Sequence, residues 1–183
     1  MKSAIVYKSV GGNTKLLADI IAQQLHIKAQ SLITSVDVED VELVYVGFWT
    51  DKGECDEDVK RFLKGLHHQK IFLFGTAGFG GDKSYFQGIL TRVQTYIDDT
   101  NEIVGTYMCQ GKMPDSVKQR YLKMSLEKPH DEHIQQMIAN FEEAVTHPDL
   151  QDLENLRSAI LEDRKSTRLN SSHIQKSRMP SSA

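Results

Sequence analysis

Short apolar runs alternate with amphipathic stretches along most of this chain, and this alternation restricts its fold more than any other feature. The runs have the length and the β-branched and aromatic content of strands, and the stretches between them carry apolar residues at helical spacing. Runs such as 42–48 are apolar almost throughout, as expected of strands buried on both faces of a parallel sheet. The predicted strands are 2–7, 29–33, 42–48, 70–75 and 102–109. The predicted helices are 13–25, 57–66, 84–97, 115–124, 131–145 and 150–161.

Strands that alternate with helices imply right-handed crossovers and a parallel sheet covered on both sides. The sequence therefore predicts an α/β fold with a doubly wound, five-stranded parallel sheet of order 2-1-3-4-5 in three layers. Residues 1–148 would form this domain, and residues 149–162 a C-terminal helical extension that either packs on it or trails from it. Ligands bind such sheets beyond the carboxyl ends of the strands, here the first, third and fourth.

Residues 163–183 differ in composition from the rest of the chain. They hold five basic residues, one acidic residue and six serines without apolar periodicity, which predicts disorder. Residues 163–173 and 177–183 match the translation of a common sequencing adapter, so we interpret 163–183 as a non-native tail without a function. The chain carries a net charge of −3, and removing the +4 of this tail leaves residues 1–162 at −7.

Composition excludes several classes of protein and site. No apolar run reaches the ~18 residues of a membrane span and the start is not a signal peptide, which together predict a cytoplasmic protein. Cys55 and Cys109 lack metal-ligand spacing and are expected to be free thiols; Cys109 is either redox-active or, the favoured interpretation, simply buried. His130 and His133 have no third ligand nearby, so no metal site is predicted.

The loop after the first predicted strand has the features of an anion site. Its residues are Ser9, Val10, Gly11, Gly12, Asn13 and Thr14. The glycines let backbone N–H groups approach an anion, two hydroxyls add donors, and the following helix contributes its positive end. The lysine of a nucleoside triphosphate loop is absent, so a phosphomonoester fits better. A plain turn whose Asn13 or Thr14 caps the helix is the equally weighted alternative.

Two further loops follow predicted strands at the same edge. The first begins with the single tryptophan and contains Trp49, Thr50, Lys52 and Gly53. Its indole would either stack on a planar ligand or cap the core. The second contains Thr76, Ala77, Gly78, Phe79, Gly80 and Gly81. Its glycine-rich backbone would lie against a ligand edge or form a flexible surface loop, and its GxxGxGG pattern is not a dinucleotide fingerprint.

Taken together, the three loops resemble those of the flavodoxin family. The family's phosphate loop, [ST]-x-T-G-[NS]-T, is matched at Ser9, Gly12, Asn13 and Thr14, whereas Gly11 stands in place of its first threonine. The resemblance covers residues 1 to about 148. More narrowly, three segments are similar to a short flavodoxin subfamily that accompanies a bacterial bilirubin reductase. These segments are FWTDKGECDEDV, FLFGTAGFGG and YMCQGKMP.

The resemblance implies a noncovalent FMN and an electron-transfer role. Its phosphate would lie on residues 9–14 and its ring between Trp49 and residues 76–81, with Phe79 the candidate for the outer face and the Lys52–Gly53 peptide facing the ring nitrogen N5. No residue would be catalytic and no metal would be bound. The −7 charge would surround the flavin with acidic groups, lower its reduction potential, and steer the protein toward a redox partner with a basic docking patch, such as a bilirubin reductase.

Two other functions stay open on the sequence. One is an FMN-dependent NAD(P)H or quinone reductase with its own substrate. The other, a non-flavin response-regulator-like signalling domain, is disfavoured because Tyr7 and Lys8 end the first strand where such a domain needs paired acids. The short chain is expected to lack a long insertion that would build a substrate pocket, which favours an electron carrier.

Overall fold

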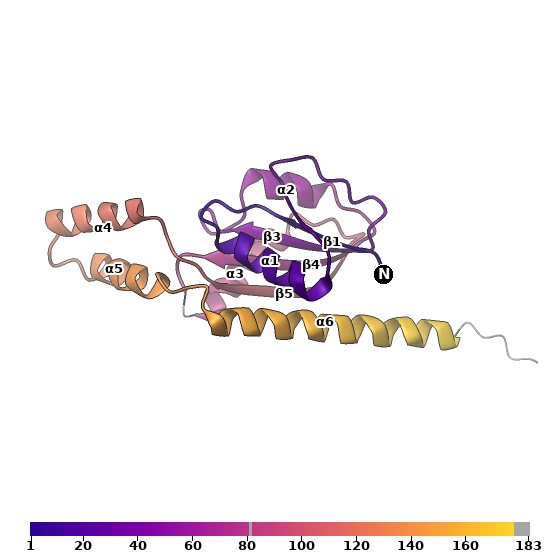
Figure 1. The fold of residues 1–183 in the computed structure, drawn as a ribbon. Coiled ribbons are helices and arrows are strands. Elements are labelled where there is room, and N and C mark those ends of the chain that lie inside the picture. Colours follow the sequence, from indigo (N-terminus) through magenta and orange to yellow (C-terminus); the bar gives the residue numbers. More distant parts are fainter. Residues whose placement is uncertain (81, 178–183) are drawn as a thin grey trace, which may run out of the picture.

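The computed structural model describes residues 1–80 and 82–177, arranged as shown in Figure 1. Its strands are β1 (Ser3–Tyr7), β2 (Ala29–Ser31), β3 (Leu43–Trp49), β4 (Lys70–Ala77) and β5 (Glu102–Gln110). Its helices are α1 (Asn13–Leu25), α2 (Glu57–Lys64), α3 (Lys83–Gln94), α4 (Asp115–Glu127), α5 (Glu132–Ala144) and α6 (Leu150–Ser177).

The five strands form one parallel sheet in the order β2-β1-β3-β4-β5, which confirms the predicted topology. Strands β3 and β4 lie inside the sheet, and every residue of β3 from Leu43 to Phe48 is buried. Burial on both faces explains why these strands are continuously apolar. Strand β2 is a three-residue edge strand that is partly exposed, which is why its sequence signal is weak.

Helices cover both faces of the sheet, which confirms the predicted three layers. On one face, Leu17 and Ile21 of α1 belong to a buried cluster with Tyr45 and Phe72 of the sheet. On the other face, the apolar residues of α2 and α3 pack with alternate residues of the same strands; they include Val59, Leu63, Ile89 and Val93. Because the side chains of a strand alternate between its faces, one apolar strand serves both layers.

Helix α6, which contains the predicted C-terminal helical extension, covers one face of the sheet. Leu156 and Ile160 are completely buried in the cluster that contains α1. The Gln24 Nε2 group of α1 donates to the Arg157 carbonyl at 3.1 Å. Figure 1 shows α6 running along β5 and α1. Of the two predicted alternatives, the structure shows the one in which the C-terminal helix packs on the domain, where it completes the layer that α1 begins.

Helices α4 and α5 form an arm, residues 111–149, that projects from the body of the protein (Figure 1). An ion pair of 2.6 Å joins Lys118 of α4 to Glu142 of α5, and the same ammonium lies 5.7 Å from the centre of the Phe141 ring. The expectation that the chain has no long insertion is therefore wrong. The apolar periodicity of α5 correctly predicts a helix, but it does not show that α5 packs with α4 beyond the sheet.

For residues 163–177 the structure also differs from the predicted disorder. Helix α6 continues to Ser177, because the sequence has no proline or glycine between Leu150 and Pro180 and each added residue gains a helical hydrogen bond. Residues 178–183 lie outside the described residues. The non-native origin of this segment stays a prediction. Although α6 has 28 residues, no described helix has both the length and the apolar character needed to cross a membrane.

One buried contact of α6 is poorly satisfied. The Tyr45 hydroxyl donates to Oδ2 of Asp163 at a long 3.5 Å, and Oδ1 has no partner among the described residues. Burial raises the pKa of the Asp163 carboxyl, because desolvation penalises its charged form. An acid whose pKa is higher in the folded than in the unfolded chain destabilises the fold above the unfolded pKa, and this cost disappears as the pH falls below that value.

We expect Asp163→Asn to stabilise the protein at neutral pH. The free energy of unfolding in urea should rise by about 1 kcal/mol at pH 7, because the buried charge is removed. The gain should shrink toward about pH 4, where the carboxyl of the unfolded chain becomes protonated. The neighbouring exposed Glu162→Gln serves as the control and should change little. A gain of the same size at both pH values would show that the charge is not its cause.

Candidate functional site

A cavity of about 650 Å³ opens at the carboxyl ends of β3 and β4, between the loops that follow them and the start of the arm. Its volume is ordinary for a small-molecule site, and its position is where doubly wound sheets bind ligands. The predicted site residues on its wall are Val10, Gly11, Asn13, Trp49, Thr50, Lys52, Gly53, Thr76, Ala77, Gly78 and Phe79. The three predicted loops therefore meet at one cavity.

Four predicted residues of these loops do not line the cavity, namely Ser9, Gly12, Thr14 and Gly80, and Gly81 lies outside the described residues. Thr14 is completely buried: its hydroxyl donates to the Phe48 carbonyl at 3.1 Å and lies 3.0 Å from the Thr76 hydroxyl. This hydroxyl ties the first loop to the ends of β3 and β4, so it is not a free donor to a ligand.

The first loop leads directly into α1. Gly12 has φ of +88°, a left-handed conformation that glycine adopts without strain, and its N–H donates to the Ser9 hydroxyl oxygen at 3.2 Å. The Asn13 side-chain amide donates to the Lys112 carbonyl at 2.9 Å, a contact that joins this loop to the segment after β5. A helix begins here with no side chain capping it, so its amino end is available to an anion.

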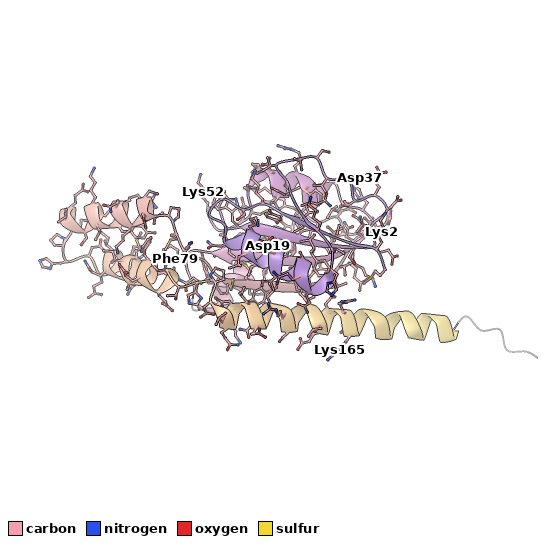
Figure 2. The ribbon with its side chains drawn as sticks, viewed as in Figure 1. Lys2, Asp19, Asp37, Lys52, Phe79 and Lys165 are labelled. Atoms are coloured by element: carbon pink, nitrogen blue, oxygen red, sulfur yellow. The ribbon has the colours of Figure 1, made fainter. Side chains whose placement is uncertain are left out.

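The second loop is held from two sides. The indole N–H of the half-buried Trp49 donates to Oδ2 of Asp56 at 3.1 Å, while Oδ1 of Asp56 accepts from the Val59 N–H and caps α2. Lys52 and Gly53 have φ of 49° and 85° and form a tight turn closed by backbone hydrogen bonds between Asp51 and Glu54. The fixed turn presents Lys52 toward the end of the sheet from which the arm projects (Figure 2).

Glu54 anchors that turn to α2 and to the chain after α3. Its carboxylate accepts from Lys60 at 2.5 Å and from the Tyr96 hydroxyl at 2.7 Å. The Lys60 ammonium, and after it the Tyr96 hydroxyl, hold the pKa of Glu54 below its usual range. Arg92 Nε also donates to the Gly53 carbonyl at 2.7 Å. The carboxylate is therefore engaged in holding the loop.

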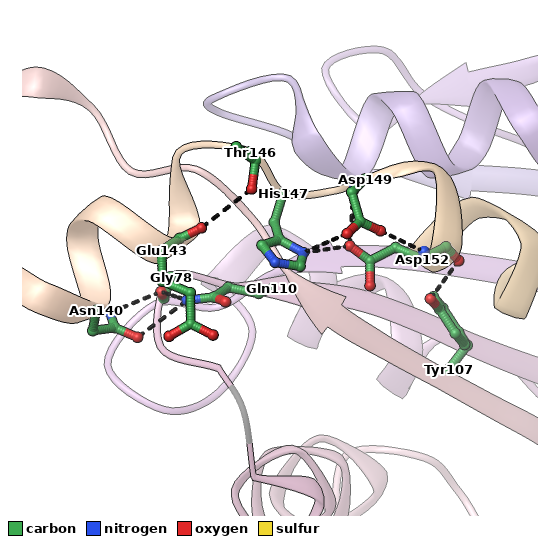
Figure 3. Close-up of polar contacts among 9 residues, drawn as sticks. All are labelled: Gly78, Tyr107, Gln110, Asn140, Glu143, Thr146, His147, Asp149 and Asp152. Atoms are coloured by element: carbon green, nitrogen blue, oxygen red, sulfur yellow. Dashed lines mark hydrogen bonds and ion pairs between the residues drawn. The ribbon is translucent and has the colours of Figure 1, made fainter.

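The third loop is fastened to the arm, as Figure 3 shows. The Gly78 carbonyl accepts from Gln110 Nε2 and from Asn140 Nδ2, each at 3.1 Å, and the two amides also bond to each other at 3.1 Å. A Cβ on Gly78 would lie 2.6 Å from Met113. Asn140 belongs to α5, so a helix of the arm fixes a backbone group at the cavity wall.

The arm supplies a wall that the sequence did not assign to the site. The additional lining residues are Asp51, Tyr85, Gly111, Lys112, Met113, Pro114, Val117 and Arg120. Most of them follow β5, whose carboxyl end lies at the same edge of the sheet as those of β3 and β4. The sequence of α4 did not predict that this helix lines the cavity, because apolar periodicity indicates a helix and not the surface that the helix faces.

The charge at the cavity is opposite to the charge of the protein. Among the described lining residues Asp51 is the one acid, whereas Lys52, Lys112 and Arg120 are basic. None of these three cations belongs to an ion pair in the part of the chain that the structure describes. The expected acidic surround is therefore wrong for the cavity itself, because the net charge of a chain does not fix where its charges gather.

The two cysteines are buried and structural. Burial raises the pKa of the Cys55 thiol to about 12 and raises that of the Cys109 thiol further still. A thiol that stays protonated is a weak nucleophile, so Cys109 has the environment of a packed side chain and not of a redox-active one.

His147, Asp149 and Asp152 place their polar atoms close together where the arm joins α6 (Figure 3). Asp149 accepts from the Asp152 N–H at 2.8 Å and Asp152 accepts from the Asp149 N–H at 2.9 Å, a reciprocal cap of α6. His147 Nδ1 lies 2.6 Å from the same Asp152 carboxylate. These hydrogen bonds explain why the three side chains lie together: they fix the start of α6 to the end of the arm.

Comparison with known proteins gives a consistent result. A family model described as "Flavodoxin domain" matches residues 4–161. The flavodoxin-like domain-containing protein BilS of Clostridioides difficile strain CD3 is 38% identical over 159 residues, which cover 84% of this chain and 90% of that protein. BilS of Clostridium symbiosum strain WAL-14163 is 35% identical over 172 residues, with the same shares. Two-electron reduced Megasphaera elsdenii flavodoxin is 23% identical with a TM-score of 0.49, covering 62% and 89% of the two chains.

We expect Asn140→Ala to loosen the third loop without unfolding the protein. The change removes one donor to the Gly78 carbonyl and a partner of Gln110, and losing a partner of a buried polar group costs about 1–3 kcal/mol. Amide hydrogen exchange in residues 77–80 should become severalfold faster. Gln136→Ala, at an exposed position of the same helix, is the matched control. Unchanged exchange in Asn140→Ala would show that Gln110 holds the loop alone.

Proposed function

Because the chain belongs to the flavodoxin domain family, whose cofactor is FMN, we propose that it is an electron-transfer protein. In this proposal it serves a partner reductase. The observation that carries the proposal is the cavity at the carboxyl edge of the sheet, where the three loops that resemble the FMN loops of the family meet.

The residues of the cavity suit this cofactor. The uncapped start of α1, preceded by Gly12 at positive φ, is a place where a phosphate is favoured. Trp49 offers a flat aromatic surface in an orientation that Asp56 fixes. The Thr50 hydroxyl is buried in the wall with no hydrogen-bond partner among the described residues, so a ligand would supply what it lacks.

In the proposed site, residues 9–14 bind the phosphate, and Trp49 with Thr50 flanks one side of the ring. Residues 76–81 and the turn at Lys52 and Gly53 flank the other parts of the ring. When bound, the flavin would supply the electron-transfer chemistry. The chain's own task is to position the ring, exclude water from it and set the surrounding charge. The bonds to Gly78 and to Trp49 are the ones that keep these walls in place.

The proposed partner is a bilirubin reductase in the cytoplasm. Support comes from segments 48–59, 72–81 and 107–114, which resemble the subfamily that accompanies such an enzyme, and from two relatives named BilS. The −7 charge of residues 1–162 would steer the protein toward a partner with a basic docking patch.

An FMN-dependent reductase acting on NAD(P)H or quinones is the second candidate. It is favoured by the arm, whose residues 111–120 add a wall beyond the loops that resemble FMN loops. Such a wall gives a small substrate a surface to bind, and its absence had been the argument for a carrier. The two candidates separate in one assay, because a reductase turns over NAD(P)H by itself and a carrier needs its partner.

We expect the purified protein to bind FMN and Trp49→Ala to bind it at least about fivefold more weakly, since an aromatic contact contributes on the order of 1 kcal/mol. The quenching of flavin fluorescence gives both dissociation constants. Trp49→Phe keeps a ring and should recover part of the affinity, whereas Val145→Ala, exposed on the arm, is the control.

The FMN titration and the NAD(P)H assay each give results that decide between these functions. A protein that takes up no FMN contradicts both flavin functions. Equal affinity in Trp49→Ala removes Trp49 from the site. Rapid NAD(P)H oxidation by the isolated protein replaces the carrier with the reductase.

A further inference from the structure

The first loop offers few side-chain donors to a phosphate. Gly11 stands where the flavodoxin pattern has a threonine, so one hydroxyl is missing. The hydroxyl of Thr14 is committed to the Phe48 carbonyl and to Thr76. Ser9 remains, and its oxygen already accepts the N–H of Gly12. A phosphomonoester carries nearly two negative charges at pH 7, so this loop has room for a further cationic contact.

Lys112 is fixed beside this loop through its backbone. Its carbonyl accepts from the Asn13 side-chain amide at 2.9 Å, and its N–H donates to the His147 carbonyl at 2.9 Å. The preceding residue, Gly111, also packs directly against the first loop, since a Cβ on Gly111 would lie 2.6 Å from Asn13 Nδ2. The carbonyl of Lys112 therefore holds this residue against the first loop, 99 positions away in sequence, while its N–H fixes it to the base of the arm.

Lys112 lines the same cavity as Val10, Gly11 and Asn13. Its ammonium forms no ion pair with any described residue, whereas Lys8 and Lys15, which flank this loop in sequence, are paired with Asp58 and Asp19, each at 2.6 Å. The other cavity cations lie elsewhere: Lys52 belongs to the second loop, and Arg120 lies within α4. Among the three cations that line the cavity, Lys112 is the one whose backbone forms a hydrogen bond with the first loop.

We propose that Lys112, at the start of the arm, binds the phosphate of FMN and takes over the role of the donors that the first loop has lost. An ammonium on a flexible stem is a suitable partner for a phosphate, and a charge-assisted hydrogen bond is about twice as strong as a neutral one. The proposal rests on the proposed FMN function, and it assigns phosphate recognition to a residue outside the family's phosphate loop.

The test compares FMN with riboflavin, which has the same ring and no phosphate. Both flavins are titrated into the apo form of the full chain, and dissociation constants are measured by fluorescence quenching. Lys112→Gln removes the charge and keeps most of the side-chain length. We expect its FMN dissociation constant to rise about tenfold, as for the loss of one charged hydrogen bond, while that for riboflavin stays unchanged. Lys112→Arg should keep the preference for FMN.

Two matched variants locate the effect. Lys123→Gln makes the same change at an exposed position of α4 that does not line the cavity, and should alter neither constant. Arg120→Gln removes a cavity cation that has no backbone bond to Asn13, and should change FMN binding less than Lys112→Gln does. Rising salt should weaken FMN binding to the parent protein more than to Lys112→Gln, because screening acts on the charge that the variant lacks.

Three results would overturn the proposal. If Lys112→Gln weakens FMN and riboflavin equally, Lys112 has only a structural role. If the preference of the variant for FMN equals that of the parent protein, the phosphate is bound without Lys112. If the parent protein binds neither flavin, the proposed function itself fails, and this result is distinct from the other two because in them the parent protein still binds FMN.

Discussion

The close packing of the end of β5 against the other loops is the contact on which the site depends. A Cβ added to Gly78, Gly80 or Gly111 would lie between 2.5 and 2.6 Å from Met113, Gln110 or Asn13, respectively. Such distances leave no space for a further carbon atom. Hydrogen bonds from Asn13 to the Lys112 carbonyl and from Gln110 to the Gly78 carbonyl follow the same path. The first and third loops are thus joined to each other through the segment after β5.

Through these contacts the arm is connected to the loops that line the cavity. The chain leaves the sheet after Gln110 and returns at His147, and the Lys112 N–H to His147 carbonyl bond closes the base of the arm. Asn140 then reaches back from α5 to the Gly78 carbonyl. A force on the arm acts on the loops that flank the proposed ring site, because rigid helices and hydrogen bonds connect the two. The arm is therefore a part of the site and not an appendage of the fold.

The sheet and its order could be predicted from the sequence because buried parallel strands are continuously apolar, as in Leu43 to Phe48. The three loops followed from that order, since parallel strands end at one edge. The arm could not be predicted, because the apolar face of α5 at Ile134 and Phe141 is the same signal whether it meets a sheet or another helix. The hydrogen bonds of the Thr14 hydroxyl could not be predicted either, because its partners, Phe48 and Thr76, are far away in sequence.

The charge of the chain acts at two distances. At long range, the −7 of residues 1–162 sets the sign of the field that an approaching molecule meets, and this field is screened over about 10 Å at ordinary salt. At short range, Lys52, Lys112 and Arg120 dominate the cavity wall. Unpaired cations that share one cavity repel one another and raise its free energy until an anion enters. The acidic net charge that would steer a basic partner and a basic cavity that would hold an anionic cofactor are therefore compatible in one small protein.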